Sequence, residues 1–282
     1  MPDLWGFAAI ATKLALYFGV LTAAGTVIAA LMFRLDRTRG LALTFGGLGL
    51  VAAVLAFSLR GANLTGDAGG MIDPEMLGLL WSTSVGTALM YRVAGLGLLI
   101  AGLFMGRVGP WASVLGGIMA IWSFNHVGHI SGLDTTLLDI ALTLHLAAVA
   151  LWIGILTPLK RLASQSVTYA AASDLGHRFG RVAMVAIPAL IVVGGYMGYQ
   201  LVGSFTALIS TGYGQALIVK VVLVASLLGL AAANKLRFIP ELRAGNPAAA
   251  SHLAKSISVE RFVILIVLGV TAVLTSNLTL PT

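Results

Sequence analysis

Long apolar runs constrain this chain more than any other feature of its sequence. Runs of about 18 or more residues with few charges recur along its whole length, and such a run can span the apolar core of a bilayer as a helix. Charged residues make up only 10% of the chain, against about 25% in a soluble domain. The sequence therefore predicts an all-α, polytopic membrane helix bundle.

The runs predict one membrane domain, residues 1–282, with eight transmembrane helices divided into halves 1–127 and 128–282. Asp73-Pro74-Glu75 has the pattern of a helix start, with Asp as N-cap and Pro in the first turn. We expect the third span to extend outward from Glu75. The expected spans are 4–33, 41–59, 85–105, 111–126, 137–157, 182–202, 215–233 and 262–278.

Basic residues are distributed very unevenly between the connecting segments. One set of alternate connections holds thirteen Lys and Arg residues, whereas the other holds Arg60 alone. Because Lys and Arg accumulate on the cytoplasmic side, both termini are expected outside, and the net charge of +7 needs no nucleic acid to explain it. The thirteen are Arg34, Arg37, Arg39, Arg107, Lys160, Arg161, Arg178, Arg181, Lys235, Arg237, Arg243, Lys255 and Arg261.

Two similar segments indicate an internal repeat. WSTSVGTALMYRV at 81–93 aligns with ISTGYGQALIVKV at 209–221, and Arg92 falls opposite Lys220. The segments open the third and seventh spans, so both would begin outside. This predicts a parallel four-plus-four repeat, with chance similarity between apolar helices as the alternative.

Three of the five histidines, His126, His129 and His145, lie close together in apolar surroundings. If the fourth span continues through His126 and His129, the two share a helix face. His145 lies eight residues into the fifth span, about 12 Å along the helix, and a short loop makes the two spans antiparallel neighbours. We therefore expect the histidines to approach one another in the outer third of the bilayer.

Such a cluster suits a metal ion, because neutral imidazole is a common ligand of Cu, Zn, Ni and Fe. An ionisable group is costly in lipid, which favours a functional role. Hydrogen bonding between helices and a proton relay are the alternatives. The sequence thus predicts a metal site at the outer mouth.

Other residues near the outer end are weaker candidates. Asn125, Asp139 and Met90 could support or supplement the histidines, although Asp139 equally suits the first turn of a helix and Met90 equally suits packing. Arg92 and Lys220 are cations inside spans, and they could snorkel outward, pair with acids or line a pathway.

The sequence also argues against several functional classes. There is no Cys, which excludes disulfides and thiolate metal ligands. No nucleophile–base constellation is recognisable, so we expect no enzymatic activity. The first span lacks a basic n-region and a small-residue cleavage site, and we expect it to be retained.

Several motifs together resemble the copper resistance protein D family. The matching segments are His145–Gly154, Arg178-Phe179, Ser210–Lys220, Ala233-Asn234-Lys235 with Pro240, and Glu260-Arg261. The resemblance implies a bacterial inner-membrane protein with eight spans, in which the termini that the basic residues place outside would be periplasmic. It also implies copper uptake or tolerance beside a separate periplasmic carrier of the CopC type, with His126, His129 and His145 as the outer histidines.

Two other functions remain open at this point. Histidines on neighbouring spans can ligate a b-type haem, although the paired histidines expected for two haems across the membrane are missing. The protein could instead be a scaffold that docks a periplasmic copper carrier through its acidic outer loops without transport.

Overall fold

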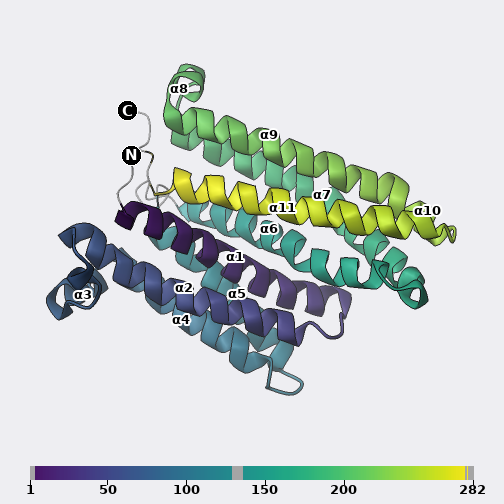
Figure 1. Ribbon diagram of the computed structural model, residues 1–282, viewed down its shortest axis with the longest axis horizontal. Helices are drawn as coiled ribbons and strands as arrows, with labels where there is room; N and C mark the ends of the chain where they lie inside the picture. Colours follow the sequence, from purple (N-terminus) through teal and green to yellow (C-terminus); the bar gives the residue numbers. More distant parts are fainter. Residues whose placement is uncertain (1–3, 129–135, 277, 279–282) are drawn as a thin grey trace.

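The computed structural model describes residues 4–128, 136–276 and 278, and within these ranges every regular element is a helix. The elements run roughly side by side as a bundle (Figure 1). The long helices are α1 Leu4–Phe33, α2 Arg39–Thr65, α4 Ser84–Gly102, α5 Gly109–Trp122, α6 Thr136–Ala163, α7 Tyr169–Val202, α9 Gly212–Ala233 and α11 Pro247–Leu274. The short ones are η1 Ala68–Met71, α3 Pro74–Trp81, η2 Ser123–His126, η4 Ser166–Thr168, α8 Phe205–Ser210, η5 Asn234–Phe238 and α10 Ile239–Arg243.

Among the described residues, seven helical segments are long and apolar enough to cross a membrane. They correspond to seven of the eight expected spans. The fourth, α5, has 14 residues and a length of about 21 Å, which is short of the roughly 30 Å hydrocarbon core. The chain continues past Trp122 as the 3₁₀-helix η2 up to His126.

Helix α1 occupies the centre of the bundle and contacts α2, α5, α6 and α11. Its side chains Leu16, Val20 and Leu21 are fully buried in the main hydrophobic core. In contrast, α7 and α9 leave large apolar side chains such as Val185 and Val222 exposed. Exposed apolar faces of this extent suit contact with lipid.

Glycines allow the central helices to touch backbone to backbone. A Cβ on Gly25 of α1 would overlap the carbonyl of Ala150 on α6, and one on Gly154 of α6 would overlap the carbonyl of Gly25. Helices α4 and α5 cross in the same way at Gly95 and Gly116. Small residues at crossings are the usual means by which membrane helices approach closely, because lipid gives little hydrophobic drive to associate.

The two segments that suggested a repeat have the same local structure. Each is a short helix, a Thr N-cap and then a long helix, and the Thr83 and Thr211 hydroxyls accept backbone N–H bonds from Val85 and Gly214. The aligned glycines Gly86 and Gly214 both lie against the backbone of the preceding short helix, where a Cβ would overlap it. The sequence similarity therefore corresponds to the same local structure at the α3–α4 and α8–α9 junctions.

Several expected boundaries were wrong. Asp73 does cap a helix, but α3 ends at Trp81 and α4 begins anew at Ser84, so the third span does not extend unbroken from Glu75. Helix α6 continues through Pro158 to Ala163, and α7 and α11 begin well before the expected spans, at Tyr169 and Pro247. These extensions are polar and lie outside the apolar runs, so hydropathy does not mark them.

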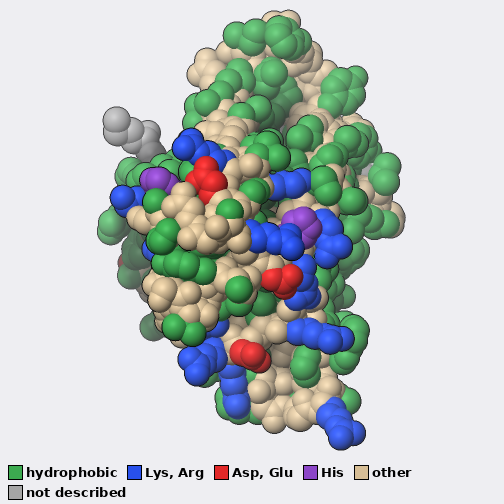
Figure 2. Space-filling model, turned by 90° about the vertical axis from the view of Figure 1, so that its right-hand side faces the viewer, with side chains coloured by type: hydrophobic (Ala, Val, Ile, Leu, Met, Phe, Trp, Pro, Cys, Tyr) green, Lys and Arg blue, Asp and Glu red, His purple; other side chains and the backbone are tan. Residues whose placement is uncertain are grey.

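Basic side chains gather at one end of the bundle. The α1–α2, α4–α5, α6–α7 and α10–α11 connections meet at the right-hand end in Figure 1, whereas α1 begins and α11 ends at the opposite end. Figure 2 faces the right-hand end and shows Lys and Arg across its surface with a few acidic and His side chains among them. We call this the cationic end. We call the opposite end, where η2 ends at His126 and α6 begins, the histidine end.

The α1–α6 crossing predicts a sharp difference between two glycines. Gly154→Ala should lower the free energy of unfolding by about 1–3 kcal/mol, because the added methyl group must push α6 away from α1. Gly97→Ala is the matched control, since a Cβ there meets nothing within 4 Å, and the alanine should be neutral or stabilising. Unfolding in detergent would measure both, and equal stability of the two variants would contradict the prediction.

Candidate functional site

His126 is the last residue of η2, at the histidine end of the bundle. Its half-buried ring stacks on Tyr91 of α4, with the ring centroids 5.0 Å apart and the planes at 15°. Its Nε2 atom is buried and has no hydrogen-bond partner in the part of the chain that the structure describes. The span expected over 111–126 is present as α5 followed directly by the 3₁₀-helix η2, so His126 ends a helical run that changes type after Trp122.

The neighbouring Asn125 joins η2 to α6. Its buried side-chain amide donates to the Thr143 hydroxyl at 3.0 Å, and that hydroxyl donates to the Asp139 carbonyl at 2.8 Å. The Asn125 Oδ1 atom is buried without a partner among the described residues. Asn125 therefore fixes the element that carries His126 against the helix that carries His145.

His145 lies in the third turn of α6 and is half-buried. Its ring lies against Gly194 of α7, where an added Cβ would be 3.5 Å from the Cε1 atom. The His145 Nδ1 atom is buried and has no hydrogen-bond partner within residues 4–128, 136–276 and 278. The absence of a side chain at Gly194 leaves the ring its space between α6 and α7.

The structure thus places two of the three predicted histidines on contacting elements at one end. His129 lies outside the described residues, so the three-histidine site stays a prediction. Across the described ranges, no group of three His, Cys, Asp or Glu side chains is arranged to hold a metal ion.

The weaker candidates lie in different settings. Asp139 is half-buried in the first turn of α6, where a carboxylate interacts favourably with the helix dipole. Met90 is 48% exposed on the surface of α4, so its thioether faces outward from the bundle. The helix dipole accounts for the position of Asp139.

Arg92 is turned into the bundle and does not snorkel to the surface. Only 7% of it is exposed, its Nε atom donates to the Ser123 hydroxyl at 3.1 Å, and its guanidinium lies 5.2 Å from the centre of the Phe124 ring. Arg92 therefore holds η2 against α4, one residue after the Tyr91 ring that stacks on His126. A cation this close to the histidines disfavours further positive charge unless an anion or a deprotonated ligand compensates.

The other two intramembrane cations differ from Arg92. Lys13 of α1 donates to the Thr275 carbonyl at 2.7 Å and to the Ser276 hydroxyl at 3.2 Å, which ties the start of α1 to the end of α11. Lys220 of α9 is half-buried and forms no hydrogen bond or ion pair to another described residue. The predicted pathway role of Lys220 stays a prediction.

A second polar cluster, which sequence reasoning missed, lies toward the cationic end. Glu260 of α11 is 1% exposed and accepts hydrogen bonds from the Trp152 indole of α6, at 3.2 Å, and from the Asn234 amide of η5. Trp152, Asn234 and Glu260 all belong to the motifs of the family resemblance. The available signal was an acidic residue two positions before the last apolar run, at Glu260.

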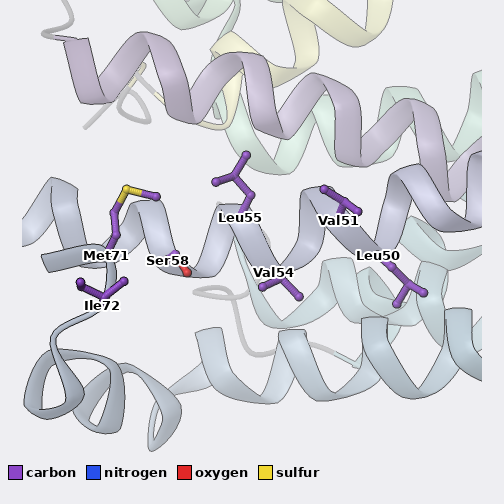
Figure 3. Close-up of a pocket in the computed structure, with 7 residues that line it drawn as sticks. All are labelled: Leu50, Val51, Val54, Leu55, Ser58, Met71 and Ile72. Carbon is purple, nitrogen blue, oxygen red and sulfur yellow. The ribbon is translucent and has the colours of Figure 1, made fainter. Parts of the chain in front are cut away.

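An apolar groove runs along the outer surface of α2 (Figure 3). Figure 3 shows Leu50, Val51, Val54 and Leu55 from α2 along it, and Met71 with Ile72 at one end. One thioether, the Ser58 hydroxyl and apolar side chains do not make a copper site. The groove is suited to a hydrocarbon chain of the surrounding lipid.

The long apolar helices, exposed apolar faces and cationic end together define a multi-pass helical membrane protein. Residues 1–139 match a family model described as copper resistance protein D-like, N-terminal domain. Residues 173–274 match the model described as copper resistance protein D. The two matches account for most of the chain, which therefore belongs to the copper resistance protein D family.

Searches of curated proteins and of solved structures found no significant match. The family assignment confirms the resemblance that the sequence motifs indicated and links the protein to copper resistance.

The Asn125–Thr143 contact can be tested by a double-mutant cycle. Asn125→Ala and Thr143→Val each remove one partner, and the coupling energy should be about 0.6 kcal/mol, the average for hydrogen bonds between membrane helices. Unfolding of the two single variants and the double variant in detergent would measure it. Strict additivity would show that the contact does not hold η2 against α6.

Proposed function

We propose that the protein handles copper at a bacterial inner membrane, in uptake or transport or in copper tolerance. Copper would bind at the histidine end through His126, His129 and His145, with Asn125 holding η2 in place. The protein would act as a carrier or acceptor of the ion and not as an enzyme. Family membership supports the link to copper, and the histidine geometry supports the place of binding.

One observation carries the proposal. Among the residues that the structure describes, the His126 Nε2 and His145 Nδ1 atoms are both buried and have no hydrogen-bond partner, and they lie on elements that contact each other at one end of the bundle. Buried polar atoms in folded proteins nearly always have partners, so two unpaired imidazole nitrogens in one region need an explanation. A bound copper ion supplies one, since imidazole nitrogen is a good ligand for it.

The basic side chains gathered at one end of the bundle support one orientation of the protein in the membrane. We propose that the cationic end faces the cytoplasm and the histidine end faces the periplasm, with both termini outside. α5 together with η2 would complete the fourth of eight crossings. The shared structure of α3–α4 and α8–α9 supports a parallel repeat of the halves 1–127 and 128–282.

A periplasmic carrier of the CopC type would deliver copper at the histidine end. The segment between α2 and α4 carries Asp67, Asp73 and Glu75, and Asp67 and Glu75 are exposed there. An acidic surface suits a partner with a basic face, because complementary charge speeds association and fixes orientation. Docking at this segment would place the carrier beside the proposed copper site.

Copper loading of the purified protein tests the site. About one copper ion should bind per wild-type chain, His145→Ala should abolish binding, and His126→Ala and His129→Ala should weaken it, because each removes a nitrogen ligand. His177→Ala is the matched control, since His177 lies on α7 near its start, at the cationic end. Atomic absorption would measure the copper content. If this content is unchanged in all three site variants, the site is refuted and the scaffold function is favoured.

The orientation can be tested cleanly because the chain has no cysteine of its own. A membrane-impermeant maleimide added to intact spheroplasts should label Asp67→Cys, which is exposed at the histidine end. Ala244→Cys, exposed at the cationic end, should react only after the membrane is broken. The reverse pattern would overturn the proposed orientation.

A further inference from the structure

Glu260 is an unusual acidic residue in this protein. Of the acidic side chains that the structure describes, it alone is buried, whereas Asp36, Asp67, Glu75 and Asp174 are exposed. It lies in α11 two residues before the expected span 262–278, and its burial disfavours a free charge.

No cation balances this carboxyl group among the described residues, where the ion pairs are Arg178–Asp174 and Arg237–Glu241. The elements packed against α11 are α1, α6, α9, α10 and η5. Their titratable or charged side chains, with those of α11 itself, are Lys13, Tyr17, Asp139, His145, Lys160, Arg161, Tyr213, Lys220, Lys235, Arg237, Glu241, Arg243, His252, Lys255 and Arg261.

Three of these cations, two on α6 and one next to Glu260 on α11, have other partners or face outward. Lys160 donates to the Ser258 hydroxyl at 2.8 Å, and Arg161 donates to the carbonyls of Asp36 and Arg37. Arg261, next to Glu260 in the chain, is exposed. Only neutral groups, the Trp152 indole and the Asn234 amide, therefore donate to the carboxyl oxygens.

The surroundings of Glu260 contain further polar atoms that lead toward the cationic end. Asn234 begins a π-helical turn, a feature that often marks functional sites, and its Oδ1 atom is buried and unpaired among the described residues. Ser256 lies one helical turn from Glu260 toward the cationic end, and its buried hydroxyl is likewise unpaired there. A proton could move between such groups and the water beyond them.

We propose that Glu260 takes up and releases a proton as part of the copper-handling cycle, an inference that rests on the function proposed above. In the uptake step a hydronium ion gives its proton to a carboxylate oxygen, forming an O–H bond and leaving water, and the group changes from charge −1 to neutral. Release is the reverse step. Protonation removes the cost of a buried charge, so the equilibrium can respond to changes in the surrounding helices.

A proton suits this position better than a second copper ion does. Both carboxyl oxygens of Glu260 already accept N–H groups, and a metal ion would have to displace these donors, which point positive charge at the site. The proton site and the proposed copper site also share helix α6. His145 and Trp152 are seven residues apart on α6, on the same face and about 10 Å apart along the axis.

Infrared spectroscopy of the protein in lipid membranes tests proton exchange without copper. A carboxyl C=O stretching band should appear and disappear as pH is cycled, should be absent in Glu260→Gln, and should shift in Trp152→Phe, which loses one hydrogen bond. Glu75→Gln is the matched control and should keep the band, because Glu75 is exposed at the start of α3. A difference spectrum between wild type and Glu260→Gln with no pH-dependent carboxyl band would overturn the proposal.

Copper movement into vesicles under an imposed pH gradient tests the coupling separately. The gradient should change the rate for wild type and have no effect on Glu260→Gln, which should still load copper at the histidine end. Wild-type movement that ignores the gradient would overturn the coupling even if copper binding is intact. If the wild-type protein binds no copper, the proposed function is refuted. The infrared measurement would still decide whether Glu260 exchanges a proton.

Discussion

The backbone contact between α1 and α6 is the constraint on which the rest of the bundle depends. Gly25 and Gly154 cannot carry side chains there, and the two helices touch through main-chain atoms. Apolar side chains gain little by leaving lipid for one another, so close packing must hold such helices together. Because α1 also contacts α2, α5 and α11, this crossing sets the position of helices from both halves of the chain.

Helix α6 contributes Gly154 to this crossing. It also contributes one residue to the proposed copper site and one to the cluster around Glu260. His145 faces Gly194 of α7 near the histidine end, and Trp152 donates to Glu260 of α11 further along the same face. The contact at Gly154 thus fixes the helix that links the proposed copper site to the proposed proton site. A small shift of α6 would change both clusters together, which is a physical basis for coupling them.

Much of the fold could be predicted because crossing a membrane depends on local composition. Seven expected spans coincide with apolar helices, and the Asp73 cap was confirmed. The break at Ser82–Thr83 and the 3₁₀ segment Ser123–His126 were not predicted, since both interrupt apolar sequence without Pro or a charge to mark them. Of the candidate site, the positions of His126 and His145 at one end were expected, whereas the hydrogen bond of Arg92 to Ser123 was not.

By itself the sequence determined that the chain forms apolar helices and belongs to a copper resistance family, because hydropathy and motif spacing are properties read along the chain. Only the tertiary structure decided that Trp152, Asn234 and Glu260 meet, since the first and last are 108 residues apart. Their hydrogen bonds depend on how α6, η5 and α11 pack. That packing is set by which glycines and side chains lie at the helix crossings, a property of the whole bundle and not of any one segment.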